Sequence, residues 1–161
     1  MERSKIIGKY IKNKTALDLG FLGENTIEDK KFDVIIAGEI IEHLENPGLF
    51  LDNIKQFIRG EGILILTTPN ILSLRHIIRH ILLGQESPYW EDRKNEIKYG
   101  HVIGFSKMLL ENLLLRKDYK IIEIGYTIKD EYCGIKGNME KLISKLFPRF
   151  APQMFVICKM E

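Results

Sequence analysis

The chain has 161 residues, of which 45% are hydrophobic and 29% are charged. These are ordinary globular values and the length can bury a sizeable core, so we expect one domain over residues 1–161. The net charge of +2 is too small to favour nucleic acid as a partner. The sequence has no recognisable signal peptide, repeat or membrane-spanning stretch, and Cys133 and Cys158 form no C-x-x-C pair. A reducing cytoplasm is therefore the expected location.

Three strands are expected in the first half of the chain. A short amphipathic helix over residues 4–12 precedes the first of them, TALDLG at 15–20. Residues 21–31 are polar and predict a loop. The apolar, β-branched runs at 32–37 and 62–67 predict the second and third strands.

The segment between the second and third strands predicts a helix with recognisable ends. Asn46 is a good N-cap, Pro47 suits the first helical position, and Gly60 suits the exit. One face of this helix is apolar and is expected to pack on the sheet; it comprises Phe50, Ile54, Phe57 and Ile58. Strand, helix and strand in this order indicate a parallel βαβ unit with chemistry at its carboxyl edge.

Residues 71–84 predict a second helix of amphipathic character. Its apolar stripe is Leu74, Ile77, Ile78, Ile81 and Leu82. Its other side, Arg75, His76, Arg79 and His80, is either solvated or meets an anionic substrate, a phosphate backbone or a membrane surface. Residues 84–104 predict a loop or lid, in which Tyr89 and Trp90 either close over a substrate or anchor the loop.

The last part of the chain predicts one helix capped by Ser106, with Leu109, Leu113 and Leu114 facing inward. Strand-like runs follow at 119–128 and 153–160, with a helix at 138–146 between them and a stop at Pro148. Two strands this late in the chain predict an antiparallel edge on a parallel sheet.

Several motifs, in the right order, resemble those of class I S-adenosylmethionine-dependent methyltransferases of the broad small-molecule type. They are ALDLGFLG (16–23), FDVIIAGEIIEHL (32–44), GILILTTPN (62–70), and HVIGFSKMLLENLL with KIIEIGY (101–126). The resemblance implies an α/β fold with a reduced Rossmann-like sheet, mostly parallel with an antiparallel C-terminal edge strand, and helices on both faces. It also implies methyl transfer from S-adenosylmethionine to an oxygen, or else a nitrogen or carbon, of a small molecule.

The glycine motif is the expected cofactor site. Glycines permit a tight turn and a close approach of backbone to a ligand, and Asp18 either accepts a hydrogen bond from the cofactor or orders the loop. A glycine turn after a strand is also common without any ligand. The resemblance implies this cofactor-binding set: Asp18, Gly20 and Gly23, with backbone near Ala37, Gly38 and Glu39.

The chain departs from the family pattern between its first and second strand motifs. Only residues 21–31 stand there, where the family has further strands and helices, including the strand whose terminal acid holds the cofactor ribose. No ribose contact is carried over, although Glu24 or Glu28 could replace the missing acid. We therefore expect TALDLG to be an edge strand. Cofactor binding is expected to be weak, dependent on a partner chain, or lost.

Glu39, Glu42 and His43 form an E-x-x-E-H cluster just past the second strand. If Glu39 starts a helical turn, the spacing places all three on one face, where they repel unless a cation, proton or basic partner sits among them. The pattern resembles the metal motif of small-RNA 2′-O-methyltransferases and ubiquinone-pathway O-methyltransferases. His101 matches the position of a further histidine in the RNA enzymes.

The expected metal ligands are thus Glu39, Glu42, His43 and His101. Carboxylates suit Mg²⁺ or Mn²⁺, and imidazoles shift the preference towards Mn²⁺ or another transition metal. Without metal, His43 or His101 is the candidate general base. The same cluster also occurs in related enzymes without an assigned metal, where it caps a helix, contacts solvent or shapes the pocket.

Two other functions remain open at this point. The shortened segment is also compatible with a non-catalytic accessory subunit that binds a full-length methyltransferase. His101 and the mild basic charge are compatible with 2′-O-methylation of RNA.

Overall fold

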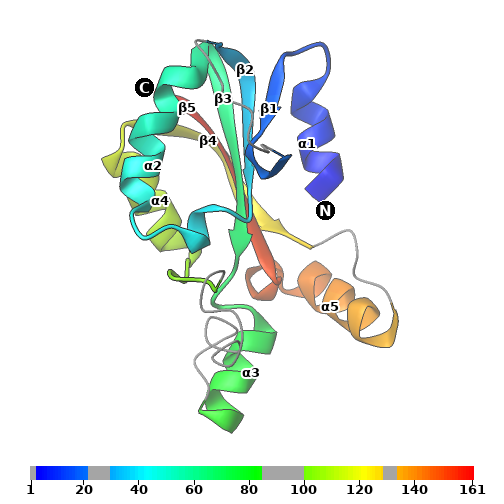
Figure 1. The fold of residues 1–161 in the computed structure, drawn as a ribbon. Helices are drawn as coiled ribbons and strands as arrows, with labels where there is room; N and C mark the ends of the chain where they lie inside the picture. The colour runs from blue at the N-terminus through cyan, green and yellow to red at the C-terminus, as the bar shows by residue number, and fades with distance from the viewer. Residues whose placement is uncertain (1–2, 22–29, 85–99, 129–133) are drawn as a thin grey trace.

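The computed structural model describes residues 3–21, 30–84, 100–128 and 134–161, and a five-stranded sheet forms its centre (Figure 1). The strand order is β1-β2-β3-β5-β4. The strands are β1 (Ala16–Asp18), β2 (Phe32–Gly38), β3 (Ile58–Pro69), β4 (Tyr119–Thr127) and β5 (Gln153–Met160). The first three are parallel to one another, and β5 runs antiparallel to both of its neighbours. The predicted α/β class and mostly parallel sheet are confirmed.

The position of the antiparallel strand differs from the prediction. β5 lies between β3 and β4, so β4 is the edge strand at that end of the sheet. The physical reason is burial: β5 is buried on both faces over six consecutive residues, whereas β4 alternates and leaves Ile122 half exposed. A strand that is apolar on both faces is stable only inside a sheet.

The other edge is β1, as predicted from the short TALDLG segment. The carboxylate of Asp33 on β2 fixes the residue that precedes β1. Its Oδ2 accepts hydrogen bonds from the backbone N–H of Thr15 at 2.9 Å and from the Thr15 hydroxyl at 2.7 Å. These bonds, led by the hydroxyl, hold the pKa of Asp33 below its usual value. Arg59 donates to the other oxygen, Oδ1, at 2.7 Å.

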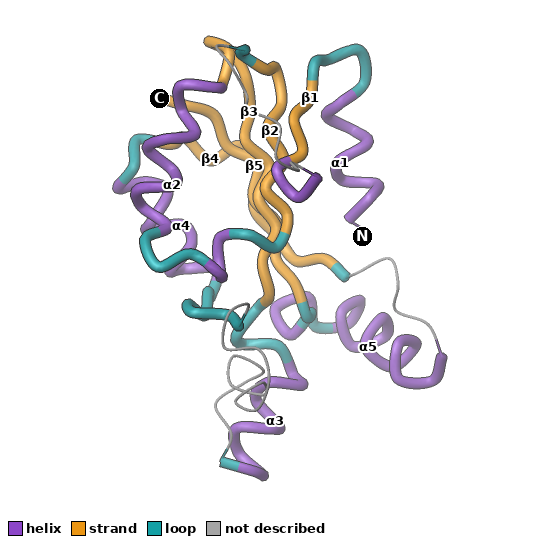
Figure 2. Tube along the Cα trace, viewed as in Figure 1, coloured by secondary structure: helices purple, strands orange, loops and turns teal. Residues whose placement is uncertain are grey.

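Helices lie on both faces of the sheet, as predicted (Figure 2). The described α-helices are α1 (Arg3–Ile11), α2 (Pro47–Ile54), α3 (Leu74–Leu83), α4 (Lys107–Arg116) and α5 (Gly134–Leu146). Helices α2 and α4 cover one face, where Leu51, Leu64 and Leu110 are fully buried in the larger core cluster. Helix α1 covers the other face and contributes Ile6 to a smaller cluster.

Helix α2 begins as predicted but ends earlier. The Asn46 side chain accepts a hydrogen bond from the Leu49 backbone N–H at 2.9 Å, which is the expected N-cap. The helix stops at Ile54, a 3₁₀ turn (Lys55–Phe57) follows, and β3 already begins at Ile58. The predicted exit at Gly60 is wrong because Ile58 pairs with Phe32 on β2, and this pairing overrides the local preference for continuing the helix.

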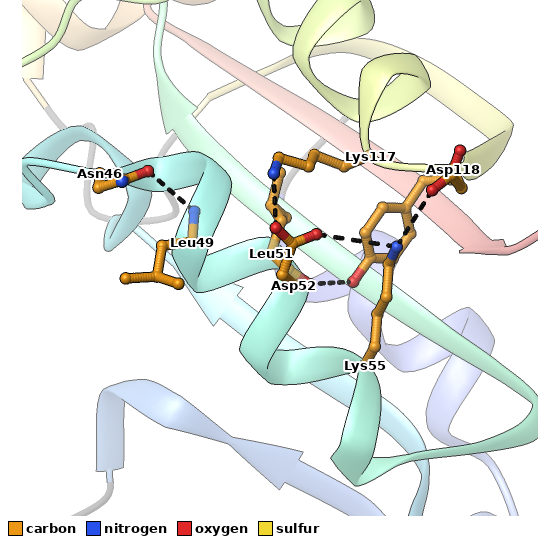
Figure 3. Close-up of polar contacts among 8 residues, drawn as sticks. Asn46, Leu49, Leu51, Asp52, Lys55, Lys117 and Asp118 are labelled. Atoms are coloured by element: carbon orange, nitrogen blue, oxygen red, sulfur yellow. Dashed lines mark hydrogen bonds and ion pairs between the residues drawn. The ribbon is translucent and has the colours of Figure 1, made fainter.

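A polar network anchors α2 to the junction between α4 and β4 (Figure 3). Asp52 pairs with Lys117, and Lys55 lies 3.7 Å from the Asp118 carboxylate. The buried Tyr119 hydroxyl donates to the Leu51 carbonyl at 2.9 Å. These contacts join three elements of the same face into one support for β2 and β3.

The later helices follow the predicted order with altered details. Ser106 caps α4 as expected, Leu114 is buried and Leu113 packs against the core as predicted, but Leu109 is 50% exposed and Leu110 is the other buried residue. Helix α5 begins at Gly134, four residues before the predicted start. Tyr89 and Trp90 lie outside the described residues. No helix among the described segments is long and apolar enough to cross a bilayer.

Candidate functional site

The predicted site residues follow the carboxyl ends of three parallel strands, which meet at one edge of the sheet. Pairing sets Asp18 of β1 beside Ile36, and Gly38 of β2 beside Thr67 of β3. In open α/β sheets this edge is where ligands bind. The fold therefore gathers the glycine motif and the acidic cluster at one edge.

Asp18 orders the turn that follows β1. Its Oδ1 accepts a hydrogen bond from the Gly20 backbone N–H at 3.0 Å, and the 3₁₀ turn Leu19–Phe21 follows directly. A Cβ added at Gly20 would lie 3.3 Å from the same oxygen, so the turn is tight at this position. Of the two roles considered for Asp18, the structure shows loop ordering. Gly23, Glu24 and Glu28 lie outside the described residues.

The Arg3 side chain, which the sequence did not indicate as part of the site, lies against Gly38. A Cβ added there would lie 2.8 Å from Cζ of Arg3 and 3.3 Å from Oγ1 of Thr67. The Thr67 hydroxyl is buried and has no hydrogen-bond partner among the described residues. Ala37 belongs to the core cluster, so only its backbone is available to a ligand. A cation at the start of α1 thus reaches the edge where β2 and β3 end.

Glu39 does not join the face predicted for the E-x-x-E-H cluster. Its backbone has φ = 58°, and its N–H donates to the Thr67 carbonyl at 2.9 Å. A left-handed residue cannot start a helical turn, and the 3₁₀ turn begins only at Ile41 (Ile41–His43). The assumption that Glu39 starts a helical turn is therefore wrong.

Glu42 is fully buried just below this edge. Its Oε2 accepts a hydrogen bond at 3.0 Å from the hydroxyl of Thr68, which is also buried at the end of β3. Burying a carboxylate is costly unless hydrogen bonds or a cation stabilise it. Strand β3 thereby fixes the orientation of Glu42, one of the four predicted ligands.

His101 is brought to the cluster by the backbone. The N–H groups of Val102 and Ile103 both donate to the Glu42 carbonyl, at 2.7 and 3.1 Å. His43 Nδ1 lies 3.3 Å from the Gly100 carbonyl oxygen, and its ring centroid is 4.6 Å from that of His101. Two segments that are 57 residues apart in sequence are therefore held together at this point.

Glu42, His43 and His101 each offer one ligand atom, and these atoms lie within 4.8 Å of one another. One buried carboxylate and two imidazoles form a donor set that fits a divalent ion. Glu39 is not part of this group. The structure thus assembles three of the four predicted ligand residues.

Asn70, at the end of the GILILTTPN run, has a structural role in this fold. Ser73 occupies the N-cap position of α3, and the Asn70 side-chain amide donates to the carbonyls of Arg149 and Ala151, both at 2.9 Å. Asn70 is a structural tie between the end of β3 and the segment before β5. Burial raises the pKa of the Cys158 thiol to about 12, which leaves it no nucleophilic role at neutral pH.

Sequence comparison places most of the chain in one family. Residues 9–124 match the family model described as a methyltransferase domain. A ubiquinone biosynthesis O-methyltransferase from Pelagibacter ubique is 28% identical over 134 residues, which cover 74% of this chain and 53% of the relative. The enzyme of the same name from Rickettsia typhi is 43% identical over 61 residues, or 24% of its own length. The chain thus spans at most about half of these relatives.

Solved structures show the same fold. The fold of a possible histamine N-methyltransferase from Thermotoga maritima matches with a TM-score of 0.54 at 12% identity, covering 86% of this chain and 60% of that one. A putative methyltransferase from Haloferax volcanii, solved with the Trm112 activator, matches with a TM-score of 0.51 at 9% identity over 83% of this chain and 56% of that one.

Proposed function

The chain belongs to the methyltransferase domain family, and from this premise we propose that it transfers a methyl group from S-adenosylmethionine to an oxygen of a small-molecule acceptor. The observation that carries this proposal is the convergence of Glu42, His43 and His101 at the carboxyl edge of the sheet. The relatives named as ubiquinone biosynthesis O-methyltransferases support oxygen as the acceptor atom.

The cofactor would lie across the ends of β1 and β2. The turn at Asp18 and Gly20, with Gly23 of the same motif and the backbone from Ala37 to Glu39, would contact it. The Arg3 guanidinium suits the carboxylate of the cofactor's amino-acid part, because planar guanidinium groups bind carboxylates in a bidentate way. The family elements that contact the ribose have no counterpart in the sequence, so we expect weak affinity.

A divalent ion would be held by Glu42, His43 and His101, with Mn²⁺ preferred over Mg²⁺ because two of the three donors are imidazoles. When bound, such an ion lowers the pKa of an acceptor hydroxyl and orients its oxygen. The protein contributes the orientation of its ligands: Thr68 fixes the Glu42 carboxylate, and the Gly100 carbonyl lies beside His43 Nδ1. In a metal-free reaction, His43 or His101 would accept the acceptor's proton.

The metal assignment is tested by titrating the chain with Mn²⁺ in a calorimeter. Glu42→Gln keeps the size of the side chain and removes its charge, so we expect Mn²⁺ affinity to fall about 100-fold. The control is Glu45→Gln, because Glu45 is exposed and outside the ligand group. If Glu42→Gln and Glu45→Gln bind Mn²⁺ with equal affinity, the metal assignment is wrong. The proposal would then keep His43 or His101 as the general base.

The methyl-donor assignment needs its own measurement. Calorimetric titration with S-adenosylhomocysteine should give detectable heat at millimolar ligand. Absence of heat while circular dichroism shows folded protein would defeat the enzymatic function.

That negative result would favour the second candidate, an accessory subunit. The short segment between β1 and β2 supports it, as does the neighbour from Haloferax volcanii that was solved with an activator protein. A stable complex with a full-length methyltransferase, measured by sedimentation, would identify this function. An RNA acceptor is the third candidate, and it requires RNA binding that weakens with salt.

A further inference from the structure

Helix α3 has an aliphatic face that does not pack on the core. Ile81 is 72% exposed, Leu82 is 74% exposed, and Ile78 is 45% exposed. The α3 side chains that the structure describes, those of residues 74–82, belong to neither core cluster, and the helix projects beyond the end of β3 (Figures 1 and 2). The stripe predicted from the sequence is therefore present, but much of it faces outward. An exposed aliphatic patch of this kind indicates an interaction surface.

Helix α5 adds a second exposed apolar patch at the same end of the sheet (Figure 1). Leu142 and Leu146 of α5, and Phe147 directly after it, are each more than half exposed. The two helices are linked, because Asn70 precedes α3 by a few residues and its side-chain amide donates to the carbonyls of Arg149 and Ala151, just after α5. The patches on α3 and α5 therefore belong to one end of the molecule.

Among the side chains that the structure describes on α3 and at the end of α5, the exposed charged ones are positive. Helix α3 contributes Arg75 and contains no acidic residue. At the end of α5 the exposed charged residues are Lys145 and Arg149. Aliphatic side chains bordered by cations fit a surface that offers acyl chains beneath phosphate groups.

We propose that α3, supported by α5, docks this end of the protein on a bilayer that contains anionic lipids. The 10 residues of α3 span about 15 Å, about half the thickness of a hydrocarbon core, so the helix would lie in the interface and not cross it. Ile81 and Leu82 would enter the acyl region, and Arg75 would contact lipid phosphates. This surface adjoins the carboxyl edge of the sheet.

Two other occupants fit less well. A second copy related by two-fold symmetry would bring the cations of α3 against the same cations. RNA would satisfy the cations but not the exposed aliphatic side chains Ile78, Ile81 and Leu82, because bases stack on aromatic side chains. An anionic bilayer satisfies both parts of the surface.

Co-sedimentation with vesicles tests the proposal without cofactor or substrate, so its outcome is independent of the methyltransferase activity. We expect binding to phosphatidylcholine vesicles with about one quarter phosphatidylglycerol to be at least about tenfold tighter than binding to pure phosphatidylcholine, and to weaken with salt. Ile81→Glu should lower that affinity about tenfold or more. The matched control is Leu115→Glu, because Leu115 is also helical and is 59% exposed, but lies on α4.

A second variant keeps the test valid if Ile81→Glu fails to fold. Arg75→Gln combined with Lys145→Gln should weaken binding several-fold and flatten its salt dependence. Absence of binding to anionic vesicles, or equal losses for Ile81→Glu and Leu115→Glu, would overturn the proposal. Self-association in lipid-free sedimentation that Ile81→Glu abolishes would also overturn it, because the occupant would then be a second copy.

Discussion

Strands β1 and β3 both lead to the candidate site, but they differ in length and support. β3 has 12 residues, is buried from Gly62 to Thr68, and is paired on both sides. β1 has three residues, of which only Leu17 is buried, and is paired with β2 alone. Helices α2 and α4 stabilise the face behind β3, and the polar network of Figure 3 joins them.

The two strands support different parts of the proposed site: β3 supports the metal ligands, and β1 supports the glycine motif that would contact the cofactor. The proposed metal ligands depend on β2 and β3, through the bond between Glu42 and Thr68 and the backbone bonds from residues 102 and 103. The glycine motif depends on β1, whose register Asp33 fixes at the strand's entry. We therefore expect the acceptor side to be preorganised and the cofactor side to be stabilised by the ligand itself.

The largest effect should come from the core of the well-supported half. Leu64 is fully buried at the centre of β3, so Leu64→Ala should lower the free energy of unfolding by about 3 kcal/mol. Leu17→Ala on β1 should cost about half as much, because that strand is at the edge and can relax into the cavity. Urea denaturation measures both. A loss at Leu17 equal to that at Leu64 would contradict the comparison.

The next effect concerns cofactor affinity. Gly38→Ala places a methyl group against the Arg3 guanidinium, which must move, and the added Cβ also lies 3.3 Å from Oγ1 of Thr67. We expect the affinity for S-adenosylhomocysteine, measured by calorimetry, to fall about tenfold. Gly60→Ala is the matched control, since nothing lies within 4 Å of the added Cβ. Unchanged affinity in Gly38→Ala would exclude Arg3 from the cofactor site.

A smaller effect should come from the cap of α2. Asn46→Ala removes the acceptor for the Leu49 N–H and should lower the free energy of unfolding by about 1 kcal/mol. Asn53→Ala, an exposed change in the same helix, should not destabilise the protein and should raise its stability by a few tenths of a kcal/mol, about 0.5 at most, because alanine has the higher helix propensity. Thermal unfolding of both variants would show whether the cap contributes to the well-supported half.

The smallest effect should be the pH dependence of the local stability of β1, whose start is held by the hydrogen bonds between Asp33 and Thr15. Because the pKa of Asp33 is lowered, chiefly by the Thr15 hydroxyl, its stabilisation is complete above the usual aspartate pKa of 3.8 and is lost as the pH falls through the lowered value. Asp33→Asn should therefore speed amide exchange in residues 16–18 at neutral pH. The difference in exchange rate between Asp33→Asn and the wild type should become smaller in acid. A difference that persists at low pH would show that the Asp33 carboxylate is not its cause.

Much of the sheet could be predicted because its strands have a continuous apolar pattern. β5 was predicted at its observed bounds for this reason. Its place inside the sheet was missed, because a sequence window shows burial on both faces but not which strands provide it. The early end of α2 was missed because pairing of Ile58 with Phe32 is a tertiary effect.

The candidate site was predictable where chemistry and spacing agree. Glu42 and His43 are neighbours in sequence, and His101 was found through resemblance to known motifs. Glu39 was misplaced because nothing in its identity signals a left-handed backbone. Arg3 was missed because it lies far from Gly38 in the chain and has no periodic signal. The outward face of α3 was unpredictable for a related reason: an apolar stripe does not specify its partner.

The placement of β5 between β3 and β4 has a consequence for synthesis on the ribosome. Within the part of the chain that the structure describes, β4 pairs with β5 alone, so β4 has no strand to join when it emerges from the exit tunnel. Residues 153–160 must be translated before that half of the sheet can close. Until then, the apolar residues of the nascent β4 lack their strand partner, and this half of the sheet closes after residues 153–160 have emerged.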